Sequence, residues 1–266
     1  MPILHAIVLG VVQGLTEFLP ISSSGHLAVV PWLFHWDELA NNPDLNQTFD
    51  VALHIGTFLG ALAYFWRDIW KLITRREQHR FGLLLLLSTI PAALVGLVFE
   101  STLADAKIWL IGVMLIVFGF VLHWADRRPT TRADEGGPKP FGPRDAAIMG
   151  IAQAMALQPG VSRAGVTITA GRLLGFDRES AARTSFLMSL PVIAGAGLYK
   201  GAKVLGDGGL EPGLAAPFFW GMAASAVTGA IAVWALLKLV QTHSFTPFIV
   251  YRVIAGLAII AIAIVR

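Results

Sequence analysis

Six apolar stretches dominate the sequence. Each is long enough, or only slightly too short, to cross a lipid bilayer as a helix. They cover residues 50–66, 82–100, 108–124, 184–200, 217–238 and 247–265. A hydrocarbon core of roughly 30 Å requires about 20 helical residues, so these lengths predict six transmembrane helices. Only 14% of the residues are charged, against roughly 25% in a soluble domain. The sequence therefore predicts an all-α polytopic membrane protein and argues against a soluble enzyme or a disordered chain.

Two further apolar stretches, residues 3–35 and 146–175, are each interrupted near the middle by proline, glycine and small polar residues. The interruptions cover residues 20–26 and 159–165. Each half holds only about ten residues, or about 15 Å of helix, which reaches the middle of a bilayer and returns. Because non-helical backbone at that depth must be buried in protein or line a polar cavity, we predict two re-entrant helical hairpins.

Basic residues are distributed unevenly between the predicted loops. Fourteen of the twenty lie on one side, four lie on the other, and Arg163 and Arg252 lie inside apolar segments. By the positive-inside rule, the richer side is cytoplasmic. The cytoplasmic segments are therefore residues 67–80, 125–145, 172–183 and 239–246. The loop 37–50 has no basic residue and lies outside, and the 146–175 hairpin begins and ends in the cytoplasm.

The two interrupted stretches resemble each other at an offset of 140 residues. Glycine and glutamine recur at matched positions, with Gly10, Gln13 and Gly25 corresponding to Gly150, Gln153 and Gly165. We predict one membrane domain over 1–266, with a first repeat over about 1–124, a connector over 125–145 and a second repeat over about 146–266. The repeat implies that the first hairpin enters from outside, so the repeats are inverted and a site is expected at their interface.

Ionisable side chains inside these apolar segments are few, and each costs about 2.5–3.5 kcal/mol on an insertion scale. Glu17, His26 and Arg163 lie in or beside the two predicted turns. Gln13 and Glu17 are four residues apart and share one helical face. The turns also contain small and hydroxyl-bearing residues, namely Ser22, Ser23, Ser24, Gly25 and Ser162. Hydroxyls, backbone N–H groups at helix N-termini and an arginine fork are typical phosphate ligands.

This combination of residues is typical of phosphoryl chemistry. A glutamate together with a phosphate binds hard divalent cations such as Mg²⁺ or Ca²⁺, and serine or histidine supplies a nucleophile or an acid/base group. A transporter or flippase of a lipid phosphate or a small anion would use the same inverted-repeat site. The Ser/His/Glu cluster favours an enzyme, because a passive anion site needs no acid/base histidine.

Other features restrict the choice further. The chain has no cysteine, which excludes disulfides and thiolate metal sites. Its net charge of +3 is too small to indicate nucleic-acid binding. We expect Arg252 to tether the last helix and His54, near the start of the first span, to be interfacial or structural.

The two turn motifs resemble those of a known family, the bacterial undecaprenyl-diphosphate phosphatases of the bacitracin-resistance type. The resemblance is carried by residues 13–26, QGLTEFLPISSSGH, and by residues 159–167, PGVSRAGVT. The closing PF…YR of residues 247–252 is similar as well. The length, the number of spans and the inverted repeat agree over essentially the whole chain.

The resemblance implies hydrolysis of undecaprenyl diphosphate to undecaprenyl phosphate and phosphate. This reaction recycles the lipid carrier for peptidoglycan synthesis and confers resistance to bacitracin. The resemblance also implies a multi-pass protein of the bacterial inner membrane, a site facing the periplasm, a polyprenyl diphosphate substrate and a divalent cation, Mg²⁺ or Ca²⁺. We consider a homodimer as its oligomeric state. We expect membrane lipid as a partner, and no nucleic acid.

The resemblance assigns roles by position. Glu17 and Gln13 form a metal-associated pair, and Ser23 is the favoured nucleophile. His26 is the acid/base partner of Ser23 or is itself the nucleophile. The expected diphosphate ligands are Ser22, Ser24, Gly25, Ser162, Arg163 and Thr167.

The sequence departs from the family pattern at two positions. Residue 13 is Gln where many members have Glu, so it can coordinate a cation but brings no charge. Residue 164 is Ala where the family usually has Ser, so a hydroxyl at that position is not essential in this chain.

Overall fold

In the computed structural model, residues 1–40, 42–104, 107–131, 141–206, 210 and 212–266 are described, and every regular element among them is a helix. The first half of the chain forms α1 (Ile3–Phe18), α2 (Ser23–Phe34), α3 (Asp37–Ala40), α4 (Pro43–Thr74), α5 (Arg76–Leu87), α6 (Ile90–Ala104) and α7 (Ile108–Asp126). The second half forms α8 (Pro143–Met155), α9 (Arg163–Leu173), α10 (Arg178–Gly206), α11 (Ala215–Val240) and α12 (Thr246–Val265).

Six helical segments are long and apolar enough to span a membrane. Four of them are the helices α4, α7, α11 and α12; the other two are Arg76–Val98, formed by α5 and the first part of α6, and Arg178–Val204 within α10. Each contains or overlaps one predicted span, so the prediction of an all-α protein with six spans is confirmed. Of the predicted connector 125–145, residues 132–140, with Arg132 and Lys139, lie outside the described residues.

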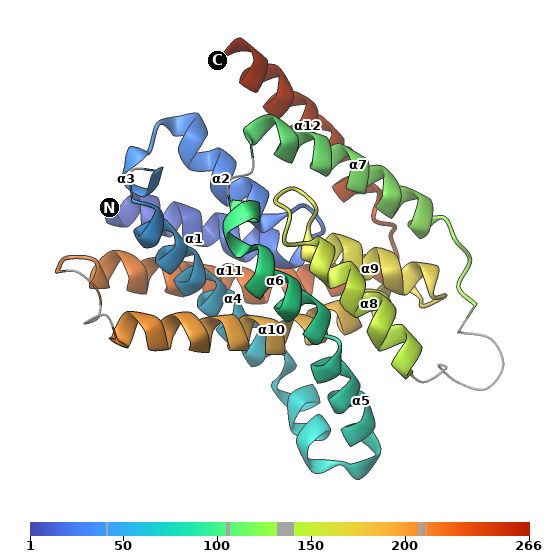
Figure 1. Ribbon diagram of the computed structural model, residues 1–266. Coiled ribbons are helices and arrows are strands. Elements are labelled where there is room, and N and C mark those ends of the chain that lie inside the picture. Colours follow the sequence, from blue (N-terminus) through green and yellow to red (C-terminus); the bar gives the residue numbers. More distant parts are fainter. Residues whose placement is uncertain (41, 105–106, 132–140, 207–209, 211) are drawn as a thin grey trace.

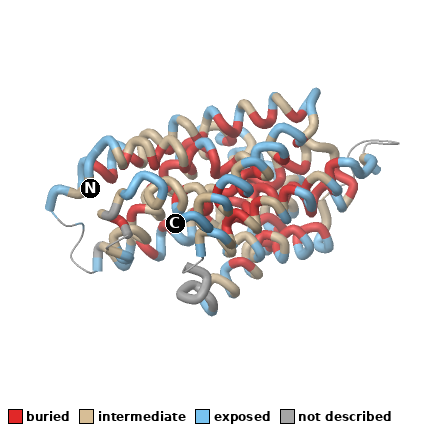
Figure 2. The backbone as a smooth tube through the Cα atoms, turned by 90° about the horizontal axis from the view of Figure 1, so that it is seen from above, coloured by how far each residue is buried: buried red, intermediate tan, exposed pale blue. Residues whose placement is uncertain are grey.

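The helices pack in two groups around the two interrupted stretches (Figure 1). In one group α11 lies between α1 and α4, and α10 packs on α4. In the other α7 packs on α12. The α8–α9 pair lies between the groups, where α9 contacts α7 and α10. Buried residues concentrate in the centre of the bundle (Figure 2), where Phe18 packs edge-to-face on Phe186 at 5.3 Å between ring centroids.

Glycines bring the backbones of neighbouring helices into close contact. A Cβ atom on Gly10 of α1 would lie 2.2 Å from the carbonyl oxygen of Gly221 in α11, and one on Gly60 of α4 would lie 2.2 Å from that of Ala226. Such small-residue contacts are the usual basis of helix association in lipid, where burial of apolar side chains gives no driving force. Because α1 ends at the residues of the first turn, this packing also positions the turn.

Replacing Gly10 by alanine should therefore destabilise the protein. The new methyl group meets backbone on the facing helix, so the helices must separate, and we expect a loss of about 1–3 kcal/mol in the free energy of unfolding. Thermal unfolding in detergent measures the change. Gly195→Ala in α10 is the matched control, because nothing lies within 4 Å of its Cβ position. An unfolding midpoint of Gly10→Ala at or above that of the control would contradict the close packing.

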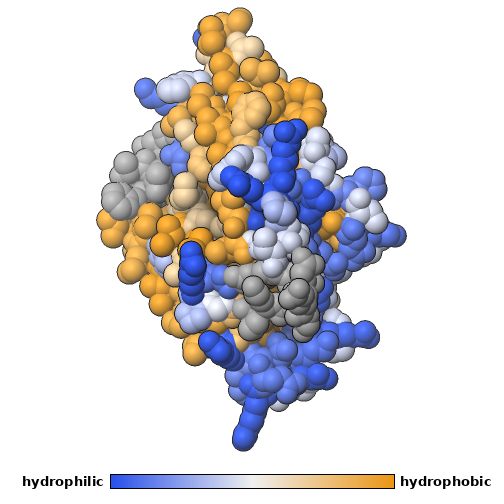
Figure 3. Space-filling model, turned by 90° about the vertical axis from the view of Figure 1, so that its right-hand side faces the viewer, coloured by the Kyte–Doolittle hydropathy of each residue, from blue (hydrophilic) through white to orange (hydrophobic). Residues whose placement is uncertain are grey.

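The outer surface of the bundle is apolar over most of its length. Large side chains such as Leu97, Leu198 and Ile264 are more than two-thirds exposed, and hydrophobic residues cover much of the face in Figure 3. Hydrophilic residues gather at its lower end, which corresponds to the junction of α4 and α5 in Figure 1. A continuous apolar surface of this extent requires lipid around it, so the chain is a multi-pass membrane protein.

At one end of the bundle, arginine or lysine side chains lie over the rings of half-exposed tryptophans. Arg67 lies over Trp66 at the end of α4, and Arg128 lies over Trp124 at the end of α7. Lys238 lies over Trp234 in the same way at the end of α11. Tryptophan beside arginine or lysine is typical of a membrane interface. These three helix ends are among those that the positive-inside rule predicts to be cytoplasmic.

The interrupted stretches form two helical hairpins, α1–α2 and α8–α9. The longest of the four helices, α1, has 16 residues, or about 24 Å, so none is long enough by itself for a hydrocarbon core of about 30 Å. Entry and return of each hairpin at one membrane face stays a prediction, as does the division of the chain into inverted repeats.

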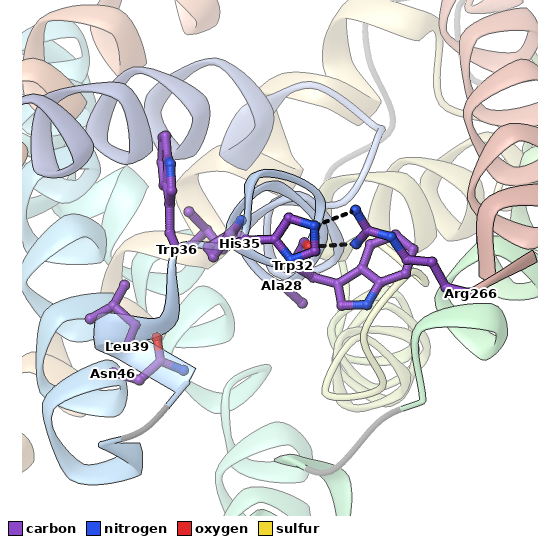
Figure 4. Close-up of a pocket in the computed structure, with 9 residues that line it drawn as sticks. Ala28, Trp32, His35, Trp36, Leu39, Asn46 and Arg266 are labelled. Atoms are coloured by element: carbon purple, nitrogen blue, oxygen red, sulfur yellow. Dashed lines mark hydrogen bonds between the residues drawn. The ribbon is translucent and has the colours of Figure 1, made fainter.

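The far end of α2 is fixed by the last residue of the chain. Arg266 donates to the carbonyl oxygens of Trp32 and Leu33 at 2.8 and 3.2 Å. Its guanidinium also lies over the Trp32 ring and is 3.0 Å from Nε2 of His35 (Figure 4). A cation beside the C-terminal carbonyls of a helix is favourable. These contacts border a cavity of about 360 Å³ at the end of α2. The opposite end of α2 carries the serines and His26.

Candidate active site

The first turn connects α1 to α2 through a strained serine. Leu19 leaves helical geometry with ψ 142°, because the residue before a proline disfavours the helical region. Ser22 then has φ 74° and accepts a hydrogen bond on its side chain from the Gly25 N–H at 3.4 Å, which caps α2. A positive φ at a non-glycine residue costs about 1–3 kcal/mol and is commonly found at functional sites.

The second turn repeats this geometry in α8–α9. Ser162 has φ 76° and accepts a hydrogen bond on its side chain from the Gly165 N–H at 3.1 Å, which caps α9. Ser162 and Gly165 lie 140 residues after Ser22 and Gly25. The N-termini of α2 and α9 are therefore both capped by a serine, at positions 140 residues apart.

The two turns lie in direct contact. The Ser22 hydroxyl accepts a hydrogen bond from the Gly160 N–H at 3.1 Å. Gly160 has φ +93°, and a Cβ atom there would lie 2.6 Å from the carbonyl oxygen of Ile111 in α7, so only glycine fits both the conformation and the space. The contact brings polar groups that are far apart in the sequence to one place.

Glu17 is the centre of the resulting polar cluster. Its side chain is 4% exposed, and its Oε1 accepts a hydrogen bond from Arg163 Nη2 at 2.6 Å. Its Oε2 accepts hydrogen bonds from the Ser23 hydroxyl and, at 3.0 Å, from Gln13 Nε2. A buried carboxylate with an arginine partner and two further donors is stable as an anion.

Two buried polar atoms beside Glu17 have no partner among the described residues. These are Nη1 of Arg163 and Oε1 of Gln13. One is a donor and the other an acceptor, and an unpaired buried group of either kind costs about 1–3 kcal/mol. Both atoms are free for a ligand, and the pair suits one that carries anionic oxygens for Arg163 and a cation for Gln13.

His26 lies beside this cluster but is bonded to other residues. Its Nδ1 is 2.7 Å from the carbonyl oxygen of Ser22, and its Nε2 is 2.6 Å from the hydroxyl of Tyr251 in α12. Ser23, the expected partner of His26, donates to Glu17 instead. The structure thus brings the expected acid/base and nucleophile candidates to one turn while giving each a different hydrogen-bond partner.

The expected diphosphate ligands are placed unevenly. Ser24 is exposed, and its hydroxyl is 3.5 Å from that of Ser22. Gly25 is buried against the second turn: a Cβ atom added to it would lie 3.5 Å from the Cα atom of Gly160. Thr167 is fully buried, and its hydroxyl donates to the Arg163 carbonyl at 2.7 Å and contacts Ser185. Because its hydroxyl is used inside the bundle, Thr167 supports the helix that carries Arg163; binding of diphosphate by Thr167 stays a prediction.

Two residues of this site were not expected from the sequence. His54 in α4, which we expected to be interfacial or structural, has its Nε2 3.5 Å from Oε2 of Glu17 and a side chain that is 33% exposed. Tyr251 reaches His26 across 225 residues. The only signal for His54 in the sequence is an ionisable side chain inside an apolar span.

Arg252 holds the two turns together. It is fully buried, and its guanidinium donates to the carbonyl oxygens of Pro20 in the first turn and of Gly160 and Val161 in the second, at 2.9–3.1 Å. It also donates to carbonyl oxygens of Met114 and Leu115 in α7. Arg252 therefore tethers the last helix, as expected, and does so through the backbone of the candidate site.

The side chains of this site fit a divalent cation only if oxygens of the substrate complete its coordination. Among the described residues there is no group of three or more His, Cys, Asp or Glu side chains arranged to hold a metal. Glu17 provides one carboxylate and Gln13 one unpaired amide oxygen. Mg²⁺ in phosphoryl-transfer sites is commonly bound by one or two carboxylates and by substrate phosphates, so these residues fit such a cation.

Comparisons with known proteins match this sequence over essentially its whole length. Residues 6–258 match the family described as "Bacitracin resistance protein BacA". The undecaprenyl-diphosphatase of Pelotomaculum thermopropionicum is 45% identical over 277 residues, which cover 100% of this chain and 98% of that protein. The undecaprenyl-diphosphatase of Geobacter sulfurreducens is 44% identical over 279 residues, which cover 100% of both chains. This chain therefore belongs to the BacA family of bacitracin resistance proteins.

Proposed function

We propose that this protein hydrolyses undecaprenyl diphosphate to undecaprenyl phosphate and inorganic phosphate. The relatives reported above are named as diphosphatases, and neither name describes a transporter. The observation that carries the proposal is the buried, unpartnered Nη1 of Arg163 next to a serine that donates to Glu17. An anionic phosphoryl group placed against Arg163 would lie beside a hydroxyl whose proton already points to a carboxylate.

Substrate binding uses the two capped turns. Nη1 of Arg163 donates to a phosphate oxygen, and the N–H groups of the first helical residues of α2 and α9, which lack an intrahelical acceptor, donate as well. The prenyl chain lies in lipid or against the apolar surface of the bundle. The turns come from opposite halves of the sequence, so one diphosphate bridges both.

The chemical step begins at Ser23. Its Oγ forms a bond to the terminal phosphorus, its proton passes to Oε2 of Glu17, and the bond from that phosphorus to the bridging oxygen breaks. Undecaprenyl phosphate leaves with the electron pair of that bond. Water then attacks the phosphoserine, and the bond from phosphorus to Oγ of Ser23 breaks to release phosphate. Oγ takes back the proton held by Glu17, and a proton of the water passes to His26, the acid/base group within the same turn. Arg163 stabilises the charge on the phosphoryl oxygens throughout.

A divalent cation, Mg²⁺ or Ca²⁺, is part of the proposal. The carboxylate of Glu17 and the free amide oxygen of Gln13 would hold it. When bound, it neutralises negative charge on the diphosphate oxygens. Gln13 brings no charge, so the cation depends on the substrate for most of its anionic ligands.

The proposed site opens toward the periplasm of a bacterial inner membrane. His54 supports this direction, because it contacts Glu17 from the part of α4 that is nearer the loop 37–50 than the basic end of that helix. The side chain of His54 is partly exposed, so a charged head group can reach this part of the cluster from the periplasmic side.

Phosphate release from undecaprenyl diphosphate by the purified protein in detergent tests this function. We expect release with Mg²⁺ or Ca²⁺, a fall of at least about tenfold with a chelator, since loss of charge neutralisation raises the barrier by more than about 1.4 kcal/mol, and recovery when metal returns. Ser23→Ala should lose turnover, whereas Ser244→Ala, remote on the loop before α12, should not. No release with any cation would reject the function, and full release by Ser23→Ala would reject Ser23 as the nucleophile.

A further inference from the structure

The ring of His26 is held on both sides. Its Nδ1 contacts the carbonyl oxygen of Ser22 at 2.7 Å, four residues earlier, and its Nε2 contacts the Tyr251 hydroxyl at 2.6 Å. The two rings also stack, with centroids 5.7 Å apart and planes 15° from parallel. These contacts fix both the position and the rotation of the imidazole.

The partners also determine the tautomer. A carbonyl oxygen only accepts hydrogen bonds, so Nδ1 of His26 must carry a proton. In the neutral ring Nε2 is then the free base, and it accepts the hydrogen bond from the Tyr251 O–H. If Nε2 takes up a proton, the same hydroxyl accepts instead of donating, so the contact persists in both protonation states.

Tyr251 is itself held in place by its neighbour in the sequence. Arg252 is bonded to the backbone of both turns, including the carbonyl of Pro20 two residues before Ser22. The backbone that carries Tyr251 is therefore fixed to the backbone that carries His26. One dipeptide of α12 thus secures the turns through Arg252 and reaches the histidine through Tyr251.

We propose that Tyr251 is a positioning residue that holds His26 with Nε2 as its basic nitrogen. The proposal rests on the proposed function, because it assigns His26 to the hydrolysis carried out at this site. It separates two hydrogen-bonded pairs: Ser23 with Glu17, and His26 with Tyr251. Ser23 thus has a proton acceptor without His26, and a proton reaches Nε2 of His26 along its hydrogen bond with the Tyr251 hydroxyl.

Tyr251→Phe tests the proposal, because it keeps the ring and the stacking and removes only the hydroxyl. We expect kcat to fall by about 10- to 100-fold, as is typical when a hydrogen bond that orients a catalytic or ligating histidine is lost, while KM stays unchanged. Tyr199→Phe in α10 is the matched control, since Tyr199 is 64% exposed and lies outside the site. Its kcat should equal that of the parent.

A second measurement, the ¹⁵N resonance of His26 Nε2, does not depend on turnover. In protein labelled with ¹⁵N at its seven histidines, the His26 signals are assigned by their loss in His26→Gln. We expect the Nε2 resonance to shift in Tyr251→Phe and to stay in place in Tyr199→Phe, because only the first removes a hydrogen bond from that nitrogen. A role of Tyr251 in packing alone would leave the resonance unmoved.

Each outcome decides the proposal. A fall in kcat together with a shifted His26 resonance supports it. An unchanged kcat, or a fall in kcat with an unmoved resonance, overturns it. If the parent releases no phosphate, the proposed function fails, and the resonance alone then decides whether Tyr251 holds His26.

Discussion

Arg163→Gln should reduce kcat for undecaprenyl diphosphate by at least about 1,000-fold, in line with the 10³–10⁵ that an arginine contributes to phosphoryl transfer elsewhere. Arg163 lies beside Ser23 and Glu17, and its buried Nη1 has no partner in the part of the chain that the structure describes. Without it, the charge on the phosphoryl oxygens develops in a buried site without the guanidinium that neutralises it. Phosphate release measures the loss, and Arg128→Gln, which removes an exposed guanidinium at the end of α7, is the control.

The same substitution should also destabilise the fold, and a partner substitution should reverse that effect alone. Arg163→Gln leaves the Glu17 carboxylate buried without its cation, and Glu17→Gln leaves the guanidinium without its anion. Removing one member of a buried ion pair costs about 3–5 kcal/mol. The double variant removes both charges, so we expect its unfolding midpoint to recover most of the loss.

Turnover should behave differently from stability in this cycle. Glu17→Gln removes the acceptor of the Ser23 proton, so the double variant should stay as inactive as Arg163→Gln. Thermal unfolding and phosphate release on the same four proteins separate the two effects. Recovery of turnover in the double variant would show that Arg163 and Glu17 only stabilise each other and would contradict their roles in the reaction.

The substrate itself changes this ion pair in the proposed reaction. A phosphoryl group that binds Nη1 of Arg163 competes with Glu17 for the charge of the guanidinium. The carboxylate then becomes more basic at the time when Ser23 must give up its proton. This competition explains why a buried arginine with one free nitrogen is useful here, whereas a fully paired one would hold Glu17 permanently as a weak base.

The spans and the two turns could be predicted from the sequence because short-range rules determine them. Pro20 and Ser22 end one helix and begin the next whatever surrounds them, and Gln13 and Glu17 meet because they are four residues apart on one helix. The cost of burying each charge favours a partner for Glu17 and for Arg163, but the sequence alone does not identify their contact across 146 residues.

Contacts that depend on packing between helices could not be predicted. His54 reaches Glu17 because glycines bring α4 and α11 close to α1, and Tyr251 reaches His26 because α12 packs on α7 beside the turns. The choice of Ser23 between Glu17 and His26 depends on side-chain rotation within one turn. No periodicity in the sequence encodes these three contacts.

Arg252→Lys should lower the free energy of unfolding by at least about 3 kcal/mol and reduce turnover by about 100-fold. Pro20, Gly160 and Val161 lie outside regular helix, and their carbonyl oxygens accept from Arg252. An ammonium group is a single point with three donors, whereas the guanidinium has a rigid fork that reaches both turns at once. Lysine therefore leaves buried carbonyl oxygens unpaired, at about 1–3 kcal/mol for each.

Thermal unfolding and phosphate release, measured at a temperature where both proteins are folded, distinguish stability from geometry. Arg127→Lys at the exposed end of α7 is the control for the chemical change. Loss of turnover in folded Arg252→Lys would show that the tether aligns Arg163 with Ser23 and Glu17. If Arg252→Lys keeps full turnover once folded, the Ser22–Gly160 hydrogen bond and the Glu17–Arg163 ion pair are enough to align the turns, and the buried arginine serves stability alone.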